Sequence, residues 1–110
     1  MTEHNEQVQV IEYLSILERQ EKLTYFAVPN GGNRDRITGA IMKREGVRAG
    51  IPDLCLIRNG QVMFIEMKRK GGRVSDNQKH TIARLNFHGV KTHICYGANE
   101  AIELINGWIK

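Results

Sequence analysis

The dipeptide Asn59-Gly60 places the strongest constraint on how this chain can fold, because it separates two apolar runs, residues 54–57 and 62–67. Asn-Gly between such runs is typical of a two-residue β-hairpin loop, since both residues tolerate the positive φ that the turn requires. We therefore predict a hairpin over residues 51–70. Both faces of this hairpin are apolar away from one end, which favours a central pair of strands covered on two sides.

In the register that a two-residue loop sets, Asp53 lies opposite Glu66. A four-residue loop over residues 58–61 keeps this pairing, whereas a three-residue loop or a bulge at Pro52 would break it. Directly opposed residues have Cβ atoms about 4.5 to 5.5 Å apart, and two ionised carboxylates at that spacing repel unless a cation lies between them. Lys68 shares a strand face with Glu66 because side chains alternate along a strand. A divalent cation such as Mg²⁺ or Mn²⁺ would suit the two carboxylates, with the backbone carbonyl of Met67 as a further ligand. The same residues would also suit a structural cluster at the surface.

Periodicity over the rest of the chain predicts three elements before the hairpin and three after it. The expected elements are helices over residues 3–20, 35–44 and 75–86 and from residue 98 or 99 onward, with strands over residues 24–28 and 90–96. A strand that follows a hairpin through a crossover helix should run parallel to the preceding strand. The predicted class is α/β, a mixed β-sheet with helices on both faces.

The length of 110 residues suits one domain, residues 1–110. No apolar run approaches the ~20 residues that span a bilayer, and the first residues are too polar for a signal peptide, so we expect no membrane partner and a cytoplasmic location. Cys55 and Cys95 fall in predicted strands and are expected to be buried, reduced thiols. The net charge of +4 and pI near 9.3 point weakly to a polyanionic partner.

Basic residues gather on both sides of the predicted site. Residues 68–73 contain four of them around two glycines and directly follow Glu66, where a phosphodiester backbone would be held. The basic residues around the second helix fit a solvated face equally well, and the glycines after Pro29 leave backbone N–H groups open to a ligand. The candidate nucleic-acid contacts are Asn30, Gly31, Gly32, Arg34, Arg48, Arg69, Lys70 and Arg73.

Three further polar residues lie near the site in the predicted helices. Glu6 projects from the edge of the apolar stripe of the first helix, beside Val10, and Glu3 also falls near that stripe. Each of these glutamates also suits a solvated position in the first turn of the helix, because the helix dipole favours a negative charge there. Ser75 and Gln78 form a Ser-x-x-Gln capping box, which explains Gln78 without a catalytic role.

A cation, an activated water and a positioned lysine together describe phosphodiester hydrolysis. Glycoside hydrolysis is a poorer fit, because only seven aromatic residues are present to build a sugar groove. The chain has no Gly-x-x-x-x-Gly-Lys-Ser/Thr loop, so no nucleotide cofactor is expected, and its four histidines lack metal-ligand spacing.

The segment from Pro52-Asp53 through twelve residues to Glu66-Met67-Lys68 resembles the PD-(D/E)xK nuclease pattern. Five motifs together resemble the VRR-NUC family, the virus-type replication-repair nucleases, in its stand-alone phage or bacterial form. These motifs are Glu6-x-x-Gln9, Asn30-Gly31-Gly32, Gly50-Ile51-Pro52-Asp53-Leu54, Phe64-Ile65-Glu66-Met67-Lys68 and Ser75-x-x-Gln78.

This resemblance implies a restriction-endonuclease-like fold and DNA cleavage that depends on Mg²⁺ or Mn²⁺. It matches Asp53, Glu66 and Lys68 to the catalytic triad, Glu6 to the N-terminal acidic ligand and Gln78 to a site glutamine. Stand-alone members are similar to junction-resolving nucleases of DNA repair that cut four-way (Holliday) junctions as homodimers, in the host cytoplasm where a phage encodes them. The rival hypotheses are a sequence-specific restriction-type enzyme of the same fold, a non-catalytic DNA-binding module and a protein-interaction adaptor.

Overall fold

The computed structural model describes residues 2–29 and 35–110. Its elements follow the predicted order, and outside the hairpin each predicted end lies within one residue of the observed one. The two hairpin strands lie within the predicted range of residues 51–70. The elements are α1 (Glu3–Arg19), β1 (Thr24–Ala27), α2 (Arg36–Arg44), β2 (Leu54–Arg58), β3 (Gln61–Lys68), α3 (Asp76–Phe87), β4 (Lys91–Tyr96) and α4 (Ala98–Trp108).

The four strands form one sheet in the order β1-β2-β3-β4. Strands β1, β2 and β3 are antiparallel neighbours, and β4 runs parallel to β3 after the crossover through α3. The hairpin register is the predicted one, with Arg58 paired to Gln61 and Leu54 to Ile65. Asn59 and Gly60 both have positive φ, 50° and 76°, as the two-residue loop requires. Asp53 lies one residue before β2, which brings it to the same end of the sheet as Glu66 and Lys68.

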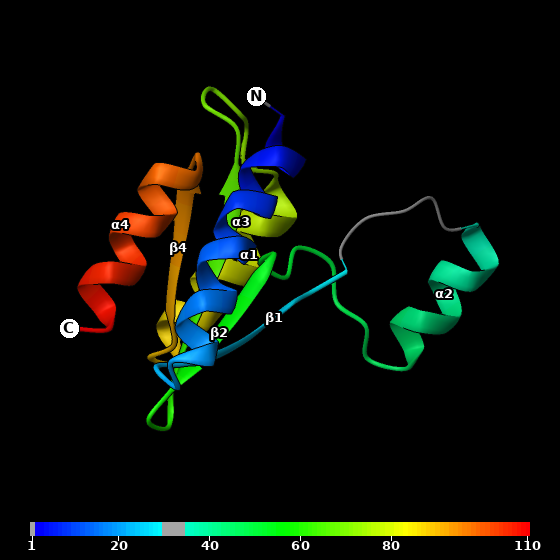
Figure 1. Cartoon of the computed structure of the whole chain (residues 1–110). Helices are drawn as coiled ribbons and strands as arrows, with labels where there is room; N and C mark the ends of the chain where they lie inside the picture. Colours follow the sequence, from blue (N-terminus) through cyan, green and yellow to red (C-terminus); the bar gives the residue numbers. More distant parts are fainter. Residues whose placement is uncertain (1, 30–34) are drawn as a thin grey trace.

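Helices cover both faces of the sheet, as predicted, and the larger core lies under α1 and α4 (Figure 1). Alternate residues of β3 point into that core, namely Met63, Ile65 and Met67, and each is at most 1% exposed. The other face of the sheet carries Glu66 and Lys68 and packs against α3. This side is polar at the C-terminal end of β3, where the crossover to α3 begins.

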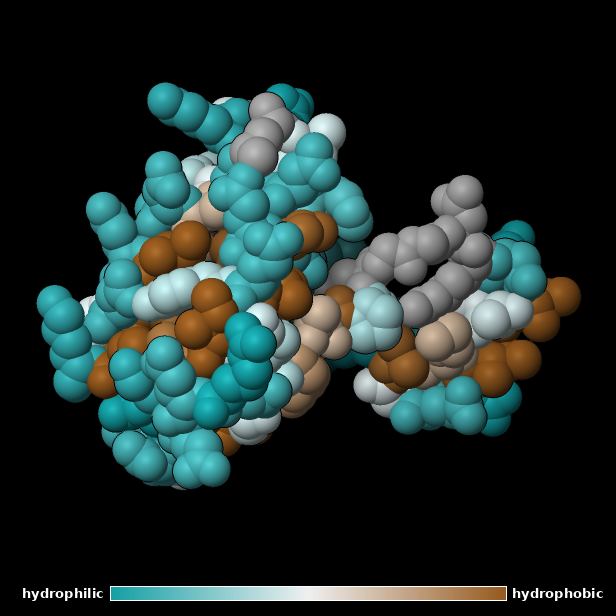
Figure 2. All heavy atoms as spheres, in the orientation of Figure 1, coloured by the Kyte–Doolittle hydropathy of each residue, from teal (hydrophilic) through white to brown (hydrophobic). Residues whose placement is uncertain are grey.

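The second helix, α2, projects from the body of the molecule (Figure 1). The helical period of this segment predicts that Ile37, Ala40 and Ile41 face inward. Instead, Ile37 and Ile41 are 75% and 53% exposed, and none of the described residues of α2 is buried. The expectation of an inner face for α2 was wrong because the chain leaves the sheet edge after β1 and returns only at β2, so α2 has no strand beneath it. Figure 2 shows hydrophobic side chains on the surface of this projecting part.

Cys55 and Cys95 are buried free thiols, as expected from their strand positions. Within the described ranges, no helix combines the length and apolar character that crossing a bilayer would need.

Candidate metal centre

Asp53 is held at the end of the sheet by bonds to two strands. Its backbone carbonyl accepts the Val28 N–H beyond the end of β1 at 2.8 Å, and its carboxylate Oδ2 accepts the Met67 N–H of β3, also at 2.8 Å. The N–H and C=O of one strand residue point to the same neighbour, so the Met67 carbonyl is directed toward the side on which Asp53 lies. Asp53 therefore has a fixed orientation beside the backbone oxygen that the sequence singled out as a ligand.

Glu66 is a buried carboxylate, with 1% of the residue exposed. Its Oε2 accepts a hydrogen bond of 2.9 Å from Gln78 Nε2 and lies 3.5 Å from Lys68 Nζ. Burial, together with the nearby charge of Asp53, raises the pKa of Glu66 to about 7, and the Lys68 ammonium opposes both effects. In the described structure, Glu66 Oε1 is buried without a hydrogen-bond partner.

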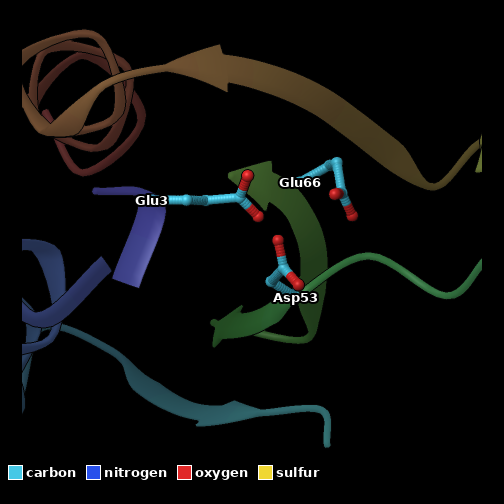
Figure 3. A group of neighbouring side chains, drawn as sticks. All are labelled: Glu3, Asp53 and Glu66. Carbon is cyan, nitrogen blue, oxygen red and sulfur yellow. The ribbon is translucent and has the colours of Figure 1, made fainter. Parts of the chain in front are cut away.

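Glu3, in the first turn of α1, supplies a third carboxylate. One ligand oxygen each from Glu3, Asp53 and Glu66 lies within 4.8 Å of the others (Figure 3). An unpartnered buried oxygen is costly, and a divalent cation bound among the three carboxylates would offset both that cost and their mutual repulsion. These are hard oxygen donors, so the residues fit Mg²⁺ or Mn²⁺.

Glu6 lies elsewhere, and this corrects the expected position of the α1 ligand. Its carboxylate accepts the backbone N–H of Ala98, the first residue of α4, and an added Cβ on Gly97 would lie 3.1 Å from Glu6 Oε2. A carboxylate at a helix N-terminus bonds an otherwise unpaired N–H and is favoured by the helix dipole. Glu6 thus ties α1 to α4, while Glu3, one helical turn away, reaches Asp53 and Glu66.

Lys68 and Gln78 both contact Glu66 from positions that other bonds hold in place. The Lys68 carbonyl accepts the Gly97 N–H at 2.9 Å, and the Lys68 side chain is only 11% exposed. The predicted capping box is present, because Ser75 Oγ accepts the Gln78 N–H at 3.1 Å and Gln78 Oε1 accepts the Ser75 N–H at 2.9 Å. Gln78 therefore has a capping role and a site contact at once.

The structure separates the predicted nucleic-acid contacts into distinct places. Arg69 and Lys70 line a small pocket of about 240 Å³ that includes Glu6 and residues 96–99. Arg48 lines a groove of about 1060 Å³ between α2 and α3, and Arg73 is exposed in the loop before α3. Asn30, Gly31, Gly32 and Arg34 lie outside the described residues.

An aspartate at the start of one strand, with a glutamate and a lysine two residues apart on the next, defines a site of the PD-(D/E)xK nuclease type. The sequence-family model of the VRR-NUC domain matches residues 5–99, and the chain belongs to this family. It is therefore a nuclease domain, for which DNA is the substrate.

Two solved structures share the fold. One, described as "VRR_NUC domain protein", has a TM-score of 0.73 and 24% identity, covering 96% of this chain and 86% of its own. Another, described as "VRR_NUC domain", has a TM-score of 0.68 and 19% identity, covering 96% and 97%. The comparison with curated proteins returned no match.

The apolar stripe of α1 places both Glu3 and Glu6 near the site, and only the family resemblance favoured Glu6. Both residues lie on the inward side of α1, and the choice depends on where α4 begins, because the α4 N-terminus competes for one of the two carboxylates. The glycine before α4, Gly97, is the available signal: its φ of 97° and the absence of a side chain allow Glu6 to approach the first N–H of the helix.

Proposed function

We propose that this chain is a divalent-metal-dependent endonuclease that hydrolyses phosphodiester bonds in DNA and leaves a 5′-phosphate and a 3′-hydroxyl. The observation that carries this proposal is the Glu66 carboxylate, which has a buried, unpartnered Oε1 and groups with the carboxylates of Glu3 and Asp53 beside the Lys68 ammonium. A buried carboxylate without a partner and with a raised pKa is more readily explained by a ligand than by stability.

The side chains of the site would have different roles in hydrolysis. Glu3, Asp53 and Glu66 would hold the cation, with the Met67 carbonyl as a further ligand, and the cation would polarise the phosphodiester and lower the pKa of an attacking water. In the reaction the water oxygen bonds to phosphorus and the bond to the 3′-oxygen breaks, after which that oxygen takes a proton. Lys68 places a positive charge where the phosphorane gains negative charge.

Gln78 supports this chemistry through Glu66. Its amide N–H fixes one carboxylate oxygen, so that the other oxygen, Oε1, is left for a ligand. This geometry also argues against a non-catalytic DNA-binding module, because a site that only bound DNA would gain nothing from a buried carboxylate that repels phosphate.

The expected substrate is branched DNA such as a four-way junction, cut by a homodimer in the cytoplasm. The outer face of α2 supports the dimer, because Ile37 and Ile41 are exposed there on a nine-residue helix. Helices this short are marginal in water without a packing partner. Contact between the α2 helices of two copies would supply that partner. Sedimentation of the Ile37→Lys, Ile41→Lys variant tests this: it should be monomeric where the wild type is dimeric.

The test of the activity is cleavage of labelled four-way junction and linear duplex with Mg²⁺, with Mn²⁺ or with chelator. Cleavage should need the metal, favour the junction and disappear in the Lys68→Ala and Glu66→Ala variants. Activity that persists in chelator, or in both variants, would overturn the proposal. Cleavage of linear duplex at a single sequence would instead establish the restriction-type alternative.

A further inference from the structure

A groove lies between α2 and α3, and Gln78 is the one residue that it shares with the proposed mechanism. It has a volume of about 1060 Å³, which is slightly more than the usual range for sites that enclose a small molecule. One wall is the side of α2 that carries Gly39, Met42 and Lys43, and the other is the N-terminal half of α3. We propose that this groove binds an unpaired arm of branched DNA next to the cleavage site, which deepens the proposed nuclease function and rests on it.

The charge of the groove fits a polyanion. Lys43 and Arg48 lie among its described lining residues, none of which is acidic. Arg48 belongs to the loop that leads to β2, and this loop is fastened to α3: the Ala49 carbonyl accepts the Thr81 hydroxyl at 2.9 Å. Gly50 also packs so closely that an added Cβ would lie 2.4 Å from the Asn77 carbonyl oxygen. The loop that carries Arg48 is therefore fixed to α3, which forms one wall of the groove.

Several lining residues of the groove are apolar, and this distinguishes the DNA that it would accept. Val28, Met42, Val47 and Ile51 line it together with Pro29. A duplex presents phosphates, sugars and the edges of its bases to such a surface, because the base faces are stacked inside, whereas a single strand can lay the faces of its unstacked bases against apolar side chains. Apolar lining residues with basic residues beside them thus favour an unpaired strand.

The groove adjoins the metal centre at one residue. Gln78 lines the groove, and its Nε2 donates to Glu66 Oε2 at 2.9 Å. A strand in the groove would therefore lie one side chain away from the carboxylates. The other face of α2, which carries Ile37 and Ile41, lies on the opposite side of the helix at 100° per residue, so the groove stays available in the proposed dimer.

The experiment measures binding by fluorescence anisotropy in chelator, so that it does not depend on cleavage. The probes are a single-stranded oligonucleotide, a blunt duplex and the same duplex with a single-stranded arm. The Lys43→Ala, Arg48→Ala variant removes the two charges, and Gly39→Phe fills the groove at a position where an added Cβ meets no atom within 4 Å. The matched controls are Gly39→Ala and the Lys91→Ala, Lys110→Ala variant, which also loses two positive charges but outside the groove.

Both groove variants should bind the single strand and the tailed duplex at least about tenfold more weakly, with less than threefold change on the blunt duplex. The controls should leave all three affinities within about twofold, and circular dichroism should show that every variant is folded. Equal losses on blunt and tailed duplex, or no loss in either groove variant, would overturn the groove proposal. If the wild type still cleaves DNA in that case, the nuclease function survives alone; if the wild type neither binds nor cleaves DNA, the nuclease function itself fails.

Discussion

Gln78 bonds to Ser75 and Glu66 at the same time: its Oε1 accepts the Ser75 N–H at 2.9 Å and its Nε2 donates to Glu66 Oε2 at 2.9 Å. The Gln78 side chain therefore both caps the N-terminus of α3 and orients the buried carboxylate of Glu66 in β3. The two roles can be separated, because Ser75→Ala removes a capping bond and leaves the amide in contact with Glu66.

Ser75→Ala and Gln78→Ala should each lower the free energy of unfolding by about 1 kcal/mol, which is typical for the loss of a helix cap. Only Gln78→Ala should also lower the cleavage rate, by about tenfold, since Glu66 loses the donor that orients it. Chemical denaturation and single-turnover cleavage measure the two effects. Equal cleavage rates in the two variants would show that Gln78 is a cap alone.

The raised pKa of Glu66 predicts how the stability of the metal-free protein depends on pH. The folded-state pKa is about 7 against an ordinary 4.5, so the folded protein holds this proton more tightly than the unfolded chain does. Stability from this group is complete below pH 4.5 and is lost as the pH rises through 7, by about 3 kcal/mol in all.

Glu66→Gln removes this titration and should match the wild type near pH 4 but exceed its stability at pH 8, measured by urea unfolding in chelator. Saturating Mn²⁺ should reverse the order at pH 8, because only the wild type gains the full stabilisation from binding the cation. A variant that is less stable than the metal-free wild type at pH 8 would contradict the prediction.

Glu3 and Glu6 should differ in what their loss changes. Glu3→Gln should weaken Mn²⁺ binding by about tenfold or more, measured by calorimetry, because a neutral amide replaces a carboxylate ligand. Glu6→Ala should instead lower the free energy of unfolding by about 1 to 2 kcal/mol, since Ala98 loses a charged acceptor. The opposite pattern, with metal affinity lost only in Glu6→Ala, would restore Glu6 as the ligand.

Lys68→Ala should retain cation binding and lose cleavage. The ammonium lies 3.5 Å from Glu66 Oε2, so it contributes charge to the reaction without being a ligand, and its removal should slow cleavage by about 10²- to 10³-fold. Calorimetry with Mn²⁺ and single-turnover kinetics separate the two properties. Lys68→Arg, which keeps the charge with a different shape, is the control for a purely electrostatic effect.

Gly50→Ala should destabilise the loop that precedes Asp53 and positions it in the site. Gly50 has a φ of +78°, and an added Cβ would overlap the backbone of Asn77 at 2.4 Å, so a loss of at least about 2 kcal/mol is expected. Gly39→Ala, in the open part of α2, is the matched control and should raise stability slightly through helix propensity. Thermal unfolding compares them, and equal melting temperatures would contradict the prediction.

The hairpin shows what could be predicted locally. Asn59-Gly60 permits one short loop, and side-chain alternation then assigns every strand residue from Leu54 to Lys68 to a face, so Glu66 and Lys68 could be placed on one face from the sequence alone. The capping box at Ser75 could be predicted for the same reason, because its bonds join residues three apart.

The burial of Glu66, by contrast, depends on contacts that no local pattern encodes. Its missing partner at Oε1 and its raised pKa arise because α3 covers that side of the sheet, whereas the sequence shows only the helix itself. The exposure of Ile37 and Ile41 was missed for a related reason: an amphipathic stripe indicates that a face will be covered, but not by which molecule.

The sequence alone determined the order of the elements, the hairpin register and the pairing of Asp53, Glu66 and Lys68, because each follows from bonds and alternation between residues close in the chain. Only the tertiary structure decided that Glu3 rather than Glu6 joins these residues, since the start of α4, 92 residues after Glu6, takes the Glu6 carboxylate. It also decided that α2 stands apart and leaves a groove beside Gln78. Such choices depend on which distant groups compete for the same side chain, and that competition exists only once the helices have packed.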